Sequence, residues 1–133
     1  MKIYYREKSG GIEILRCFGI EGRVEIPGMI DGKLVISAAP YAFSSHMDEK
    51  EELKNASLWE VSEGLGFGRE EHVLAGNDVE EIVFPDTLKE IGRYIFYGCG
   101  NLKKLELSDS LMQIGCGAVS YTHLRAHETC ADL

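Results

Sequence analysis

Two histidines near the carboxyl end have the spacing of a metal site. His123 and His127 lie four positions apart, and Glu128 follows directly. On a helix this separation places both imidazoles on one face, where they can share a zinc ion. The alternative is that this segment is not natural protein sequence, in which case the two histidines have no role.

The four cysteines could support disulfide, metal or thiol chemistry. Cys17, Cys99, Cys116 and Cys130 form no CxxC pair. Without a recognisable export signal we expect all four to be reduced. A reactive thiol needs a basic neighbourhood, and the sequence shows none. We therefore interpret Cys17 and Cys99 as small buried apolar residues.

One glycine-rich stretch, Gly64-x-Gly66-x-Gly68, has a faint likeness to a nucleotide-binding loop. The preceding strand and following helix that make such loops bind phosphate are not predicted around it. The chain also lacks the GxSxG, HExxH and Walker patterns. The sequence therefore predicts no catalytic residue, no cofactor and no metal.

Composition is that of a small soluble globular domain. The chain has 133 residues, of which 44% are hydrophobic and 27% charged, and its formal charge is −8. Proteins that bind nucleic acids or anionic membranes commonly carry clusters of Lys and Arg. Because this chain is acidic, we expect neither as a partner. Charges at residues 6–8 interrupt any signal-peptide run. We expect a cytoplasmic location, or the cell surface if the true start lies upstream.

Two segments, 79–92 and 102–115, repeat one apolar pattern at an offset of 23 positions. Equivalent positions are Val79 and Leu102, Ile82 and Leu105, Phe84 and Leu107, Leu88 and Leu111, Ile91 and Ile114, and Gly92 and Gly115. A single coil of this length cannot bury its apolar face alone. Stacked coils can, and their strands then form a parallel sheet along one flank.

The spacing within each repeat predicts its local structure. Ile82 and Phe84 are two apart and point to one face of a short strand. Leu88 and Ile91 are three apart, which predicts a tight or 3₁₀-like turn that returns apolar residues inward. Gly92, like its counterpart in the next repeat, would permit a sharp reversal of the backbone.

A longer first unit precedes these two repeats. Residues 24–27 (Val-Glu-Ile-Pro) match the strand-then-proline pattern, and residues 40–43 match residues 93–96 at an offset of 53. The extra residues 29–33 contain Asp-Gly at 31–32, which is typical of a hairpin turn. Terminal units of solenoids are commonly atypical in this way.

The combined pattern resembles the BspA-like leucine-rich repeats of bacteria, over roughly residues 12–45 and 78–118. The segments that carry it are Ile82-Val83-Phe84-Pro85, Ile91-Gly92, Tyr94-Ile95-Phe96 and Gly98-Cys99-Gly100-Asn101-Leu102. The resemblance implies a leucine-rich-repeat solenoid and says little about its function. Exported members of the family are often surface proteins that bind host or matrix proteins.

An insertion at residues 46–77 interrupts the repeats. Met47–Asn55 is predicted to form a helix, with Ser45 as its capping residue. Trp59 and Phe67 are candidates for binding a protein partner, because loops carry function and Trp is enriched at interface hot spots. The alternative is that both rings only cover the side of the solenoid.

The tail breaks the repeat pattern after Ala118, where Phe is expected. Residues 119–129 are similar to a translation of the transposase-end and adapter DNA of sequencing libraries. This implies a truncated gene from a metagenomic or draft assembly, and a non-native tail at 119–133. A solenoid without a polar cap exposes its last coil, so we expect end-to-end self-association. The exposed residues would be Leu105, Leu107, Leu111 and Ile114.

These observations predict an α+β, mainly β fold: a short leucine-rich-repeat solenoid with parallel strands at a 23-residue period and one helical insertion. The domain would span residues 1–118, with an atypical unit at 1–45 and two repeats at 78–118. We expect a non-catalytic protein–protein interaction scaffold with an unknown protein partner. The alternatives are a fragment of a bacterial surface adhesin, or the non-catalytic part of an enzyme whose catalytic domain is missing.

Overall fold

The computed structural model describes residues 1–19, 22–44, 53–60, 72–116 and 131–132. Within these ranges the only helical element is a short 3₁₀ turn, η1 (Gly76–Asp78). The strands are β1 (Lys2–Lys8), β2 (Gly11–Gly19), β3 (Arg23–Glu25), β4 (Met29–Ile30), β5 (Lys33–Ala38), β6 (Ser57–Glu60), β7 (His72–Val73), β8 (Glu81–Val83), β9 (Glu90–Ile91), β10 (Lys104–Glu106), β11 (Gln113–Ile114) and β12 (Ala131–Asp132).

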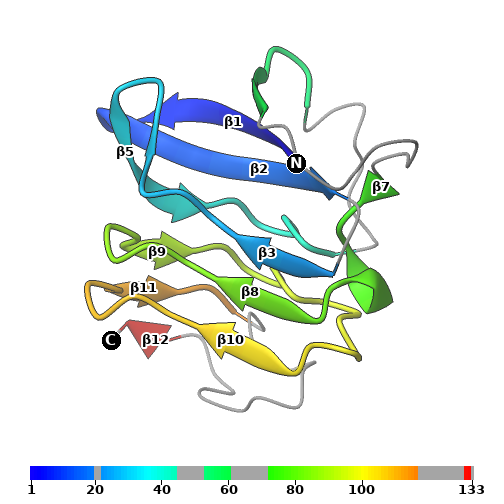
Figure 1. Ribbon diagram of the computed structural model, residues 1–133. Helices are drawn as coiled ribbons and strands as arrows, with labels where there is room; N and C mark the ends of the chain where they lie inside the picture. Colours follow the sequence, from blue (N-terminus) through cyan, green and yellow to red (C-terminus); the bar gives the residue numbers. More distant parts are fainter. Residues whose placement is uncertain (20–21, 45–52, 61–71, 117–130, 133) are drawn as a thin grey trace.

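The strands form two sheets that enclose one core (Figure 1). In the larger sheet, hereafter sheet A, the strands β2, β5, β9 and β11 run parallel to one another. In the smaller sheet, sheet B, β3, β8 and β10 are also parallel. One strand from each sheet makes one coil, and stacking the coils lets each bury its apolar face against the next. The solenoid prediction is confirmed.

Strand pairing shows the predicted repeat directly. Ile82 lies beside Leu105 in sheet B, and Ile91 lies beside Ile114 in sheet A, each pair 23 positions apart. The longer first unit stacks in the same register, with Ala38 beside Ile91. Its extra residues form the predicted hairpin of β4 and β5.

That hairpin turns at the two residues that the sequence indicated. Asp31 has a φ of 53° and Gly32 a φ of 75°. Two successive positive φ angles give the turn whose twist matches that of the flanking strands. Ile30 then pairs with Lys33 across the turn.

The tight turn after sheet B is present, but the glycine that follows β9 has another role than predicted. The Leu88 amide donates to the Pro85 carbonyl at 3.2 Å and closes the turn. Gly92 has no positive φ; instead, a Cβ there would lie 2.2 Å from the Pro40 nitrogen of the preceding coil. The reversal itself is made by Tyr94, with a φ of 49°. Gly92 is needed because two backbones pass too closely for any side chain.

The core holds a stack of phenylalanines that joins successive coils. The rings of Phe43 and Phe96 lie 6.1 Å apart and 24° from parallel. Phe84, directly after β8, lies against both rings. All three are buried, and equivalent positions in successive coils therefore pack on one another.

The amino-terminal strands close one end of the stack. β1 and β2 form an antiparallel hairpin, and β2 then joins the parallel strands of sheet A through β5. β6 pairs with β1 on its outer side. Figure 1 shows this hairpin at the end of the stack opposite to β10 and β11.

The predicted helical insertion is not supported by the part of it that the structure describes. Residues 47–52 of the expected helix lie outside the described residues, but residues 53–55 form a turn in which Asn55 has a φ of 65°. Strand β6 follows at once. Its backbone donors and acceptors find partners on β1, and this tertiary pairing decides its structure over local propensity.

At the other end, the last coil is less exposed than predicted. Leu105 and Leu107 are half-buried, as expected for an incompletely covered face. Leu111 and Ile114 are buried, with exposed fractions of 8% and 4%, so the prediction was wrong for these two residues. β12 pairs with β11 and extends the sheet beyond them. The remainder of the predicted non-native tail lies outside the described residues.

Candidate functional site

A polar network crosses the outer face of sheet A and is centred on Glu13. Glu13 lies in β2 between Ile12 and Ile14, which point into the core. Strand alternation therefore places its side chain on the outer face. The residue is nevertheless only 2% exposed, and a buried carboxylate needs charged or hydrogen-bonding partners.

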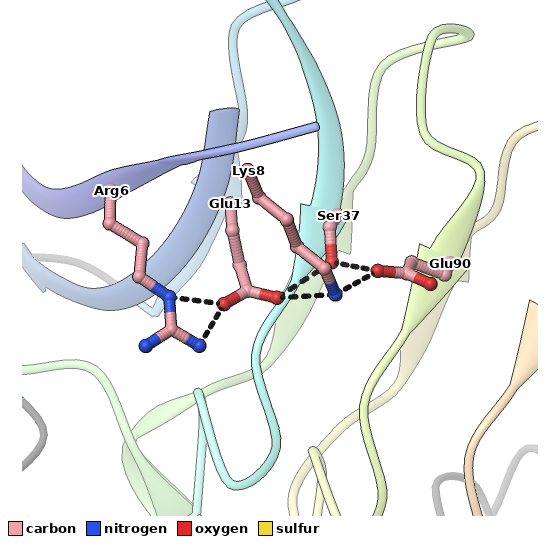
Figure 2. A network of polar contacts seen from close by, with 5 residues as sticks. All are labelled: Arg6, Lys8, Glu13, Ser37 and Glu90. Carbon is pink, nitrogen blue, oxygen red and sulfur yellow. Dashed lines mark hydrogen bonds and ion pairs between the residues drawn. The ribbon is translucent and has the colours of Figure 1, made fainter. Parts of the chain in front are cut away.

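Basic residues of β1 supply the partners of this carboxylate (Figure 2). Arg6 donates through Nε to Glu13 Oε1 at 2.7 Å, and its Nη2 lies 2.5 Å from the same oxygen. Lys8 Nζ lies 3.2 Å from Glu13 Oε2 and also pairs with Glu90 Oε1 of β9. Lys8 thus joins the amino-terminal hairpin to a coil that begins about eighty residues later.

Ser37 of β5 fills the gap between the two carboxylates. Its Oγ lies 3.0 Å from Glu13 Oε2 and 2.9 Å from Glu90 Oε1. A hydroxyl has a single proton to donate, so it serves one carboxylate at a time. The Lys8 ammonium, which contacts both, has three protons and supplies the remainder.

The contacts of this network favour the charged forms of Lys8 and Glu90. The hydrogen bond to Glu90 raises the pKa of Lys8, and the hydrogen bond from Lys8 lowers the pKa of Glu90. A general acid at neutral pH needs a carboxyl whose pKa is raised by burial or by like charge. Glu90 is shifted in the opposite direction. The network therefore fixes β1, β2, β5 and β9 against one another.

Two adjoining depressions border the network on the same face. One, of about 250 Å³, runs over the backbone of Gly92 towards Arg93. The other, of about 300 Å³, lies beside Lys89 and Met112. Both are lined by Lys8, Glu90 and Gln113. Because they share these three residues, the two depressions adjoin, and they are together called the sheet A trough below.

The candidate binding and metal-ligating residues predicted from the sequence do not lie at the sheet A trough. Trp59 lies in β6, paired with Ile3, and its half-buried ring packs against the core. Its partner in the prediction, Phe67, lies outside the described residues. The same is true of the Gly64 to Gly68 loop and of the segment with His123 and His127. Among the ranges that are described, no three potential ligands are placed to hold a metal ion.

Two of the four cysteines are placed as predicted. Cys17 and Cys99 are free and buried, and burial raises the pKa of Cys17 to about 12 and that of Cys99 to about 11. The Cys99 thiol donates to the Phe43 carbonyl at 3.3 Å. Cys116, in contrast, is disulfide-bonded, so the expectation of four reduced thiols was wrong for this residue.

Sequence reasoning missed the Glu13 network, although one signal was available. Glu13 is a charged residue within the apolar run Ile12 to Leu15, and a charge on a buried strand needs a partner. The identity of that partner could not be read from the chain, because Ser37 and Glu90 become neighbours only when the coils stack.

Comparison with known proteins agrees with the repeat architecture. Residues 70–130 match the family described as BspA type leucine rich repeat region (6 copies). No curated protein sequence matches the chain.

Two solved structures have a similar fold. A leucine-rich-repeat protein of T. pallidum superposes with a TM-score of 0.60 at 24% identity, over 86% of this chain and 40% of that one. A leucine-rich cell surface protein of Faecalibacterium prausnitzii A2-165 gives 0.57 at 19% identity, over 90% of this chain and 27% of that one. The chain thus spans less than half the length of either protein. No helix among the described residues is long and apolar enough to cross a membrane.

Proposed function

Because the chain carries a BspA-type leucine-rich-repeat region, we propose that it is a non-catalytic protein-interaction scaffold. The observation that supports this most is the stack itself, which sets side chains in rows along the outer faces of both sheets. In sheet B, Arg23, Glu81 and Lys104 lie side by side in register. Such regular, solvent-facing rows form extended surfaces of the kind that repeat proteins use for binding.

The proposed scaffold function can be tested by photo-crosslinking of the chain to partner proteins from three different faces of the solenoid. A photoreactive phenylalanine analogue would replace Val83 on sheet B, Gln113 at the sheet A trough or Trp59 on β6. A matched control would carry it at Asp109, in the turn after β10. Protein adducts from one of the three faces, competed by unlabelled chain and absent from the control, are expected. Adducts that resist competition at every position would contradict the proposal.

Trp59 and Phe67 remain our proposed partner contacts within the insertion. Trp59 is half-buried beside the exposed Leu58 at the edge of the described part of sheet A. Truncation of an aromatic hot spot typically costs 2 kcal/mol or more of binding free energy, about thirtyfold in affinity. Trp59→Ala and Phe67→Ala should each weaken the complex found by crosslinking, whereas Leu58→Ala should not. Equal effects of all three would favour the alternative, in which the rings only cover the solenoid.

We propose a surface location as the alternative to the cytoplasmic scaffold. The cell surface protein of Faecalibacterium prausnitzii A2-165 is among the similar folds. Protease treatment of intact cells of the native host distinguishes the two locations, because only a chain at the surface is exposed to the protease. Survival of the chain would support the cytoplasmic scaffold, and its loss would support the surface location.

We also propose that the chain can associate with a second copy through its last coil. Leu105 and Leu107 are half-buried there, and β10 is the edge strand of the described part of sheet B, which can pair with another strand. Light scattering should show a mass that rises with concentration, and Leu105→Lys should abolish the rise. A constant monomer mass at high concentration would contradict the association.

A further inference from the structure

The sheet A trough holds more cations than carboxylates, whereas the chain as a whole has a net charge of −8. Three cations, Lys8, Lys89 and Arg93, line it, against the carboxylates of Glu13 and Glu90. Those two carboxylates are already paired with Arg6 and Lys8. Lys89 and Arg93 therefore lie outside these pairs.

Lys89 and Arg93 are the cations left for a partner. Both are exposed, and no carboxylate in the described ranges pairs with either side chain. Lys89 lines one of the two depressions and Arg93 lines the other, while Glu90 and Gln113 line both. By comparison, the cations of sheet B, Arg23 and Lys104, are engaged by carboxylates of their own face.

The shape and lining of the trough indicate which kind of ligand could pair with Lys89 and Arg93. Gly92 and Gly115 leave its floor bare, because stacking of the coils excludes a Cβ at both positions. Exposed Met112 and the ring of Pro40 supply apolar contact along its walls. Two adjoining open depressions, each lined by an exposed cation and by apolar atoms, suit an extended chain that carries carboxylates.

We propose that the sheet A trough binds an extended acidic peptide segment of a protein partner, with carboxylates of the segment on Lys89 and Arg93. This rests on the proposed scaffold function and names the chemistry of the partner. The Glu13 network supports the trough, because Lys8, Ser37 and Glu90 line the trough and are hydrogen-bonded to one another. A cationic segment would find Glu90 already paired with Lys8.

The test uses a fluorescein-labelled octaglutamate peptide and fluorescence polarisation at low ionic strength. Lys89→Glu/Arg93→Glu should weaken binding about tenfold, since each exposed charge contributes modestly. The matched control, Lys103→Glu/Lys104→Glu, makes the same change of net charge on sheet B and should bind as the wild type does. Circular dichroism would verify that both variants are folded. Added salt should weaken the wild-type complex.

Three results would overturn the proposal. Equal weakening by both variants would indicate attraction by overall charge. Equal binding of octalysine would remove the charge selectivity, and tighter binding of a single-stranded oligonucleotide would identify a different partner class. None of these results contradicts the proposed scaffold function. That proposal is contradicted only if the crosslinking experiment gives no adducts that unlabelled chain competes away.

Discussion

Gly92 offers the sharpest test of how the coils stack. Its backbone has no positive φ, so conformational preference alone favours replacement by alanine. Replacing a glycine at a permissive position stabilises a protein by about 0.4–1 kcal/mol, because the unfolded chain loses freedom. The stacking geometry predicts the opposite sign. An added Cβ would lie 2.2 Å from the Pro40 nitrogen and 2.6 Å from the Ala39 carbonyl carbon.

The size of the effect follows from the atoms involved. Ordinary contact begins near 3.4 Å, and the contacting atoms are backbone, which cannot swing aside. The coils would have to separate at the hydrogen bond from the Gly92 amide to the Ala38 carbonyl, which is 2.8 Å long. Overpacking of this kind costs up to about 3 kcal/mol, occasionally more. Gly92→Ala should therefore destabilise the chain by about 3 kcal/mol.

Urea unfolding followed by far-ultraviolet circular dichroism measures this change. With a slope of about 2 kcal/mol per molar, the midpoint should fall by about 1.5 M. Gly28→Ala is the matched control, since its Cβ would meet only the Pro85 Cβ at 3.7 Å, and its midpoint should stay or rise slightly. A Gly92→Ala midpoint equal to or above that of the wild type would refute close stacking as the reason for this glycine.

Three further predictions concern the core, the polar network and the thiols. Phe96→Ala should lose about 3–5 kcal/mol of unfolding free energy because it empties a buried ring site; exposed Met112→Ala should change it by less than about 0.5 kcal/mol, and similar losses for both would contradict the stacked core. The pKa of Glu90 is lowered, so its stabilisation is present above the ordinary pKa of 4.5 and is lost as the pH falls through the lower value. Urea midpoints measured from pH 7 to pH 2 should therefore fall less for Glu90→Gln than for the wild type, and parallel curves would be inconsistent with this pairing. Cys17 and Cys99, with pKa values of about 12 and 11, should react with Ellman's reagent only after unfolding; rapid labelling of the native chain at pH 8 would refute their burial.

Much of the architecture could be predicted from the sequence because it depends on periodicity. The 23-residue offset between Ile82 and Leu105 places both on one sheet whatever else the chain does. The Asp31-Gly32 turn is equally local, since these two residue types tolerate positive φ. Burial of Cys99 was predicted because no basic residue beside it in the sequence would activate a thiol.

Tertiary structure alone decided the features that join distant segments. Ser57–Glu60 forms a strand because its backbone pairs with that of β1. Position 92 must be glycine because the backbone of Pro40, from another coil, passes beside it. The Glu13 network joins side chains of β1, β2, β5 and β9, whose sequence separations reach the 82 positions between Lys8 and Glu90. Repeat spacing determines which residues face the core, but it does not determine which charged side chains pair on the outer face. That pairing depends on how the coils and the terminal hairpin are stacked, and no local sequence pattern carries that information.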